Sequence, residues 1–143
     1  IHHGRLYVLD SGRGRLCTVD PDTGRVDTVA ELPGYTRGLA FVGNTALVGL
    51  SRIREKRFFG GMPIEQRPEA LRCGVAAVDL ASGAVTGLLE CASGATELFD
   101  LRFLPGLARP NIIGLDRAEA RQAVTEPNSS WWLLPSNGEP GGS

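Results

Sequence analysis

The sequence lacks the features that mark common zinc-binding, disulfide-bonded and membrane proteins. Its three cysteines, Cys17, Cys73 and Cys91, have no C-x-x-C spacing, which argues against a zinc site or a thioredoxin-like motif. The odd number of cysteines also argues against a framework of disulfides, so we expect free thiols in a reducing cytoplasm. No apolar run approaches the roughly 18 residues of a membrane-spanning helix, and no signal-peptide pattern opens the chain. The sequence therefore predicts no membrane partner.

The chain also lacks an excess of charge of either sign. It has 15 basic and 16 acidic residues, and its formal net charge is -1. No overall field steers such a chain towards nucleic acid, which we therefore do not expect as a partner. With 19 glycines, 9 prolines and few long periodic runs, the composition favours short strands and turns over helices.

Short runs of β-branched and aliphatic residues, bounded by Gly, Asn or Ser, fill the first two thirds of the chain. Such runs are typical of antiparallel strands joined by tight turns. The predicted strands are Arg5–Asp10, Arg15–Asp20, Arg25–Ala30, Gly38–Val42, Thr45–Leu50, Gly74–Asp79 and Ala84–Glu90. We expect two further strands between Leu98 and Leu115.

Two motifs recur in the same order along the chain. Val19–Val26 and Val78–Val85 share the pattern Val-Asp-x-x-(Thr/Ser)-Gly-x-Val, and Gly38–Gly43 is similar to Asp100–Gly106. Fixed-order repeats of strand-turn-strand units are the sequence sign of a β-propeller, in which each blade is one antiparallel sheet. The predicted fold class is therefore all-β, a propeller-like array of short antiparallel blades.

The predicted strands make about two and a quarter blades. A closed ring needs at least four blades of roughly 40 residues each, so we expect part of a larger propeller. Such a part would self-associate or be completed by a missing upstream region. The expected boundaries are a partial propeller at 1–115, with blade remnants 4–30, 36–91 and 97–115, a long loop insertion 51–73, and a loosely attached or disordered tail 116–143.

An ordered set of segments resembles a known bacterial family. The segments are Leu9–Leu16, Val19–Phe41, Val48–Glu55, Arg72–Gly74 and Glu97–Leu101. Together they resemble an uncharacterised propeller-like domain of unknown function that is sometimes found with tetratricopeptide proteins. The resemblance implies the C-terminal part of a larger propeller, because family members have a longer region upstream where this chain has Ile1–His3. It implies no established activity.

In a propeller, the connections within and between blades that emerge on one face usually meet the ligand. On this chain we expect that face to carry residues 31–35, the insertion 51–73 and residues 92–97. Arginine beside aromatic residues suits a carboxylate, a phosphate or an acidic protein surface. The candidate ligand-binding residues are Arg37, Arg52, Arg54, Lys56, Arg57 and Phe58.

A solvated loop is the alternative interpretation of the same insertion. In that case its phenylalanines hold it against the blade, and Glu55 and Glu65 offset its charge.

Glu97 and Asp100 allow a second hypothesis, a metal-dependent lactonase-like hydrolase. Lactonase-type propellers hold a divalent metal in their channel with acidic and amide side chains, and His2, His3 or Asp10 could add ligands here. A hard cation prefers several oxygen ligands, so further ligands would have to come from elsewhere. The competing explanation is that Asp100 caps a turn or pairs with an arginine.

No nucleophile elbow is present for a Ser-His-Asp device. Whether the chain is an enzyme or a binding scaffold therefore stays open at the level of sequence.

Overall fold

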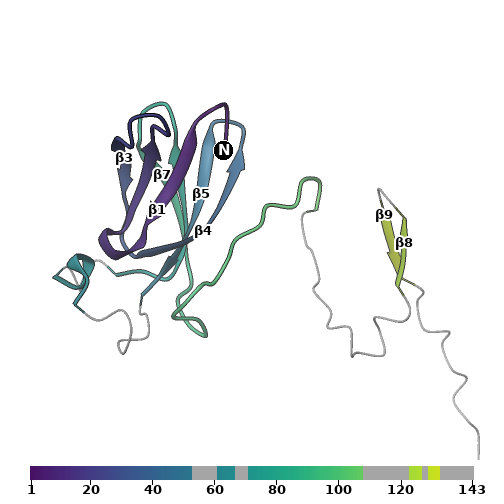
Figure 1. Ribbon diagram of the computed structural model, residues 1–143. Helices are drawn as coiled ribbons and strands as arrows, with labels where there is room; N and C mark the ends of the chain where they lie inside the picture. The colour runs from purple at the N-terminus through teal and green to yellow at the C-terminus, as the bar shows by residue number, and fades with distance from the viewer. Residues whose placement is uncertain (53–60, 67–70, 108–122, 127–128, 133–143) are drawn as a thin grey trace, which may run out of the picture. The chain divides into compact units, whose positions relative to one another are not determined.

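The computed structural model of this 143-residue chain describes residues 1–52, 61–66, 71–107, 123–126 and 129–132 (Figure 1). The chain divides into two units, residues 1–104 and 105–143. The described part is all-β, and its only helical elements are two short 3-10 turns, η1 (Ser11–Arg13) and η2 (Pro63–Gln66). None of the helices among these residues is long and apolar enough to cross a membrane.

The first sheet has three antiparallel strands in the order β1-β2-β3. The strands are β1 (Leu6–Asp10), β2 (Arg15–Val19) and β3 (Val26–Glu31). Each lies within a residue of its predicted position, because aliphatic residues alternate along the run and turn residues bound it.

The second sheet has four antiparallel strands in the order β4-β5-β6-β7. The strands are β4 (Tyr35–Val42), β5 (Thr45–Ser51), β6 (Gly74–Asp79) and β7 (Val85–Glu90). The prediction of a complete four-stranded meander is confirmed. Strand β4 starts earlier than predicted because Gly38, which looked like a strand boundary, sits inside the strand at φ +71, where the register with β5 shifts.

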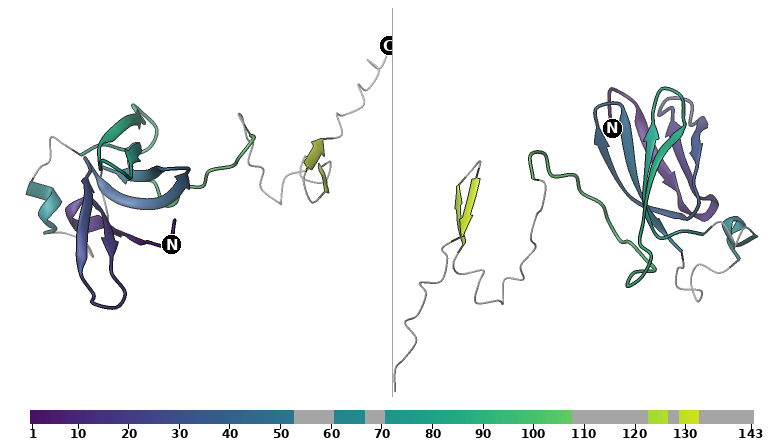
Figure 2. Two further views of the ribbon diagram at one scale, coloured as in Figure 1. Left: turned by 90° about the horizontal axis from the view of Figure 1, so that it is seen from above. Right: turned by 180° about the vertical axis from the view of Figure 1, so that it is seen from behind.

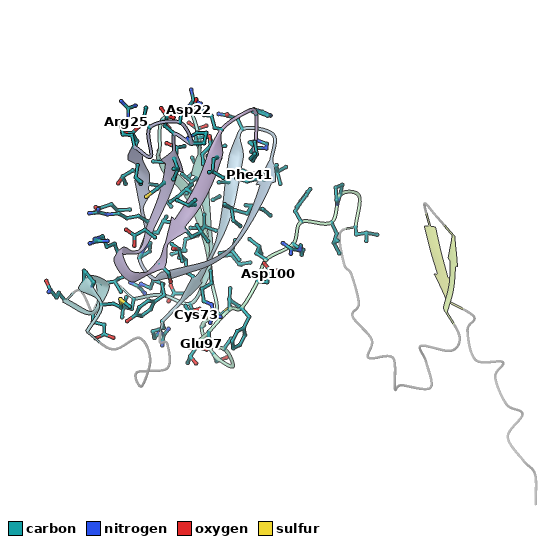
Figure 3. The ribbon with its side chains drawn as sticks, viewed as in Figure 1. Asp22, Arg25, Phe41, Cys73, Glu97 and Asp100 are labelled. Atoms are coloured by element: carbon teal, nitrogen blue, oxygen red, sulfur yellow. The ribbon has the colours of Figure 1, made fainter. Side chains whose placement is uncertain are left out.

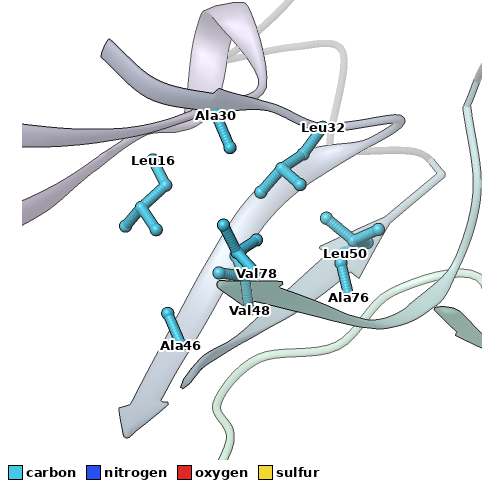
Figure 4. Packing of buried hydrophobic residues seen from close by; sticks show 8 residues of the cluster. All are labelled: Leu16, Ala30, Leu32, Ala46, Val48, Leu50, Ala76 and Val78. Carbon is cyan, nitrogen blue, oxygen red and sulfur yellow. The ribbon is translucent and has the colours of Figure 1, made fainter. Parts of the chain in front are cut away.

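The two sheets pack face to face around one hydrophobic core (Figure 4). Figure 2 shows the same unit from above and from behind. Side chains alternate across a strand, so every second residue of β5 and β6 faces this core. The buried cluster consists of Leu16, Ala30 and Leu32 from the first sheet and its exit, and Ala46, Val48, Leu50, Ala76 and Val78 from the second.

The repeated motif forms the same turn in both sheets, once between β2 and β3 and once between β6 and β7. Asp20 Oδ1 accepts the backbone N–H of Asp22 at 2.9 Å, and Asp79 Oδ2 accepts the backbone N–H of Ser82 at 3.0 Å. The glycine four residues after each aspartate donates its N–H to the aspartate carbonyl at 2.8 Å, with φ +71 in one turn and +73 in the other. The two sheets therefore correspond strand for strand, with β1, β2 and β3 matching β5, β6 and β7.

Residues 97–107 form no strand, although the sequence predicts the start of a third blade there. The start of this stretch, residues 96–98, instead lies against the end of the second sheet, where the Arg52 N–H donates to the Thr96 carbonyl at 2.9 Å and the Leu98 N–H donates to Ser51 Oγ at 2.9 Å. A strand exists only when its backbone pairs with another strand. The rest of the predicted unit, 108–115, lies outside the described residues.

A short two-stranded sheet lies within the stretch 116–143 that the sequence predicts as a loosely attached or disordered tail. Strands β8 (Ala123–Glu126) and β9 (Ser129–Trp132) form a two-stranded antiparallel sheet, in which Val124 pairs with Trp131. β-branched and aromatic residues such as Val124 and Trp131 favour strands. The described sheets are open, and they do not close into a ring.

Candidate functional site

The connections predicted to form a ligand-binding face emerge together at one end of residues 1–104. Figure 3 shows Cys73 and Glu97 at this end, and Asp22 and Arg25 at the opposite end. Three connections start here: the link 31–35, the insertion that follows β5 and the segment that follows β7. They share this end because successive connections between antiparallel strands alternate between the two ends of a sheet. We call the described residues Arg37, Arg52, Arg72, Glu90 and Glu97 at this end the arginine cluster.

Two guanidinium groups in the cluster share one carboxylate. Arg72 Nη1 lies 3.2 Å from Glu90 Oε1 and 3.4 Å from Glu90 Oε2, and Arg52 Nη2 lies 3.9 Å from Glu90 Oε1. All three side chains are partly exposed, at 48%, 43% and 33%. One negative charge therefore stands against two positive charges, which leaves room for a second anion.

The register of three strands creates this arrangement. Leu50 pairs with Gly74, and Gly74 pairs with Glu90, so the ends of β5, β6 and β7 lie side by side. Arg52 follows the end of β5, and Arg72 precedes β6 by two residues. The sequence separates these side chains, and the sheet brings them together.

Backbone hydrogen bonds hold both arginines in place. The Arg52 N–H donates to the Thr96 carbonyl at 2.9 Å, and the Arg72 N–H donates to the Pro33 carbonyl at 2.6 Å. The first bond joins Arg52 to the segment that follows β7, and the second joins Arg72 to the link 31–35. The main chain under the guanidinium groups is therefore fixed, while the side chains stay accessible.

Arg37 extends the cluster along β4. Its Cζ lies 4.6 Å from the ring centroid of Phe99, and its Nη1 lies 3.9 Å from Glu97 Oε2. Phe99 is 71% exposed. A cation over an exposed aromatic face gains roughly 0.5–1 kcal/mol, so the ring orients the guanidinium without neutralising it.

The described part of the insertion is fastened to the body of the unit. Ile64 in η2 is buried, and the Tyr35 hydroxyl donates to Glu65 Oε1 at 2.9 Å. Glu65 Oε2 also accepts the backbone N–H of Gly61 at 3.0 Å. Glu65 thus has a structural role.

The structure brings together some of the predicted site residues. Arg37 and Arg52 both lie in the arginine cluster, whereas Arg54, Lys56, Arg57 and Phe58 lie outside the described residues. Arg72, Glu90 and Phe99 were not predicted as site residues. The signal that could have found Arg72 is its place at the far end of the same insertion that Arg52 begins.

The predicted metal ligands are engaged with arginines. Glu97 lies beside Arg37, and Asp100 Oδ2 lies 2.9 Å from Arg102 Nη2. Asp100 Oδ1 also accepts the Leu101 N–H at 2.8 Å. Within the described ranges, no three His, Cys, Asp or Glu side chains come together in a group that could hold a metal ion.

The histidines near the N-terminus belong to a different region. The ring of His2 stacks on Phe41 with 4.3 Å between centroids, and its Nε2 lies 2.8 Å from the Gly43 carbonyl oxygen. Figure 3 places Phe41 away from Glu97, nearer the opposite end of the sheets.

Hollows in the surface occur at both ends of the unit. At the end with η1 and η2, a hollow of about 310 Å³ is lined by Arg13, Arg15, Glu31 and Pro63. Another of about 500 Å³ is lined by residues that include Asp20, Arg25 and Asp27. Acidic groups line the second hollow beside its arginines, so its volume alone does not favour an anionic ligand there.

Comparison with known proteins places the chain in a family. Searches of curated proteins and of solved structures found no match. A family profile described as Domain of unknown function (DUF4915) matches residues 1–113, which include both larger sheets and the whole arginine cluster. Because the match spans most of the 143 residues, the chain belongs to the DUF4915 family of domains of unknown function.

Proposed function

We propose that this domain is a propeller-type binding scaffold that receives an anionic group at the arginine cluster. The observation that carries the proposal is that Arg52 and Arg72 share the single carboxylate of Glu90 where three strands end. The anionic group is a carboxylate or phosphate, presented either by a small ligand or by an acidic surface of a partner protein.

The outward face of the second sheet supports the propeller part of the proposal. Ala46, Val48 and Leu50 face the core, so the alternate residues of β5 and their register partners face away from it. These outward positions include Ala40, Leu47, Val75, Ala77 and Leu89, and all of them are apolar and at least partly exposed. A sheet that faced only water on this side would carry polar residues there.

The outward face of the first sheet is also apolar. Leu6, Val19 and Val26 are register partners on the side away from the core, and Val26 is 58% exposed. Two sheets that are apolar on both faces are expected when further blades cover them on either side. On this interpretation the two sheets are consecutive blades, and residues 96–101 lead towards the next one.

Titration with two probes tests the proposal. Inorganic phosphate represents the small ligand, and a polyglutamate peptide represents the acidic surface. We expect binding that weakens as salt rises, because screening acts on exposed charges. The double variant R52A/R72A should lose at least about tenfold in affinity for the probe that binds, since charge-assisted hydrogen bonds are worth roughly 1.5–3 kcal/mol each.

Arg25 provides the matched control. It is also an exposed arginine paired with an acid, with Nη2 2.9 Å from Asp27 Oδ2, but it lies at the opposite end of the sheets. R25A should therefore bind as the wild type does. Equal affinities for R25A and R52A/R72A, or no binding of either probe by the wild type, would contradict the proposal.

The lactonase-like alternative gains no supporting observation from the described residues. Its two candidate carboxylates, Glu97 and Asp100, each pair with an arginine, and such pairing competes with a cation for the same oxygens.

A further inference from the structure

Cys73 and Cys91 stand directly opposite each other at the end of the second sheet. Cys73 precedes β6 and Cys91 follows β7, and the neighbouring residues Gly74 and Glu90 are register partners. The Cys91 N–H donates to the Cys73 carbonyl at 2.8 Å, so the ladder continues through this pair. Both thiols are free.

The spacing of such a pair suits a disulfide. Opposite residues that are hydrogen bonded in an antiparallel ladder have Cα atoms about 5.5 Å apart. Disulfides usually join Cα atoms about 4.4–6.8 Å apart, and opposite side chains project from the same face of the sheet. The two thiols can therefore be joined without moving the strands.

The surroundings give the two cysteines different roles. Cys73 is fully buried, whereas Cys91 is partly exposed. Burial raises the pKa of the Cys73 thiol and the adjacent Cys91 raises it further, while the charge of Arg52 lowers it. Cys91 is thus the thiol that a dissolved reagent meets first, and Cys73 is positioned to attack it from within.

We propose that Cys73 and Cys91 form a site of reversible disulfide formation, with a low-molecular-weight disulfide such as oxidised glutathione as the oxidant. The Cys91 thiolate attacks one sulfur of that disulfide, which breaks its S–S bond and releases one reduced thiol. The Cys73 thiol then gives its proton to solvent, attacks the Cys91 sulfur and displaces the second reduced thiol. The two protein thiols lose two electrons in total, and one molecule of the reagent gains them.

The bond would form beneath the arginine cluster. Arg72 and Glu90 are the neighbours of the two cysteines in sequence, and they form the shortest of the three ion pairs of the cluster. This inference does not depend on the binding of an anion, because it rests on the backbone pairing of Cys73 with Cys91 and on the different burial of the two thiols.

Peptide mapping of the full chain tests the proposal. The folded protein is incubated with oxidised glutathione, its remaining thiols are alkylated, and it is digested without reductant by a protease that cleaves after glutamate. Cleavage after Glu90 separates the two cysteines, so a disulfide appears as two linked peptides. We expect the Cys73–Cys91 link with Cys17 alkylated, a fall from three titratable thiols to one, and full reversal by dithiothreitol.

Serine variants assign the order of attack. C73S should stop at a mixed disulfide of Cys91 with glutathione, whereas C91S should stay reduced because Cys73 is buried. C17S is the matched control, since Cys17 is a buried thiol whose register partners are Val8 and Thr28, and it should retain the link.

Four outcomes in the wild type would overturn the proposal: no reaction, a mixed disulfide at Cys91 that goes no further, a bond that includes Cys17, or a bond between two chains. Because these are read from the wild type, the test stands even if a variant fails to fold.

Discussion

Arg72 and Glu90 form an ion pair between residues that the sequence places far apart, with Arg72 Nη1 3.2 Å from Glu90 Oε1. The pairing depends on the register of β6 with β7, which sets Gly74 opposite Glu90. Arg52 approaches the same oxygen at 3.9 Å, so the negative charge of Glu90 lies next to any anion that these two arginines hold and repels it.

Removal of the Glu90 charge should therefore strengthen anion binding. An exposed ion pair is worth up to about 1 kcal/mol, so E90Q should raise the affinity for phosphate by up to about fivefold. The control D27N removes the carboxylate beside Arg25 at the opposite end and should change nothing. Calorimetric titration at low salt measures both, and weaker binding by E90Q would argue that Glu90 positions the arginines rather than competing with the ligand.

The aspartate turn makes a prediction about pH. Hydrogen bonds from the Ser82 hydroxyl and backbone N–H lower the pKa of Asp79 in the folded protein. A carboxyl group whose pKa is lowered by folding stabilises the fold above its unfolded pKa of about 3.9, and this contribution is lost as the pH falls. D79A should lower the melting temperature at pH 7, and the difference from wild type should shrink below about pH 4.

Asp22 supplies the control for that experiment. It lies in the matching turn of the first sheet, where its backbone N–H donates to Asp20 Oδ1. D22A should melt close to the wild type at both pH values. A D79A difference that persists unchanged in acid would show that the charge of Asp79 is not the cause.

The face-to-face core predicts that truncating two leucines of β5 lowers the stability by different amounts. Leu50 is fully buried in the cluster between the sheets, whereas Leu47 lies on the outward face and is partly exposed. Truncation of a buried leucine costs about 2–5 kcal/mol, because it removes contacts and leaves a cavity. L50A should lose that much free energy of unfolding in urea, and L47A clearly less; equal losses would contradict the assigned faces.

Most of the strand pattern could be predicted from the sequence because it depends on local signals. Alternating aliphatic residues and the repeated Asp-x-x-(Thr/Ser)-Gly turn define β2, β3, β6 and β7 without knowledge of the rest of the chain. Gly38 misled the prediction because a glycine at positive φ can end a strand or bulge within it, and only the pairing with β5 decides. Residues 97–107 carried a strand-like motif, but no neighbouring strand pairs with them in the part of the chain that the structure describes.

The candidate site was harder to predict for a related reason. Arg52 stood out because it opens a run of basic residues, whereas Arg72 and Glu90 belong to no local motif of charge. Their meeting depends on which residues of β5, β6 and β7 lie side by side, and register is a property of the folded sheet.

The apolar outward faces predict self-association of the 143-residue chain. Leu89 is 71% exposed on the outward face of β7, next to its register partner Val75. Burying such surface against another copy is favourable at roughly 25 cal/mol per Å². L89K should shift the sedimentation of the chain towards monomer, whereas A81K adds the same charge in the β6–β7 turn and should not; a monomeric wild type would contradict the prediction.

The cysteine pair predicts that mild oxidation stabilises the fold. A disulfide between Cys73 and Cys91 closes a loop of about 18 residues that contains β6 and β7, and it reduces the entropy of the unfolded chain. For a loop of this length the expected gain in the free energy of unfolding is up to about 3 kcal/mol. Strain in the bond would reduce this gain, but the register of the strands already brings the two residues together. Urea denaturation of the wild type before and after treatment with oxidised glutathione measures the gain.

C73S and C17S provide the two comparisons, since the first should gain nothing from the oxidant and the second should gain as much as the wild type. Loss of stability on oxidation of the wild type would mean that the bond strains the end of the sheet, and that the register does not position the two sulfurs as we infer.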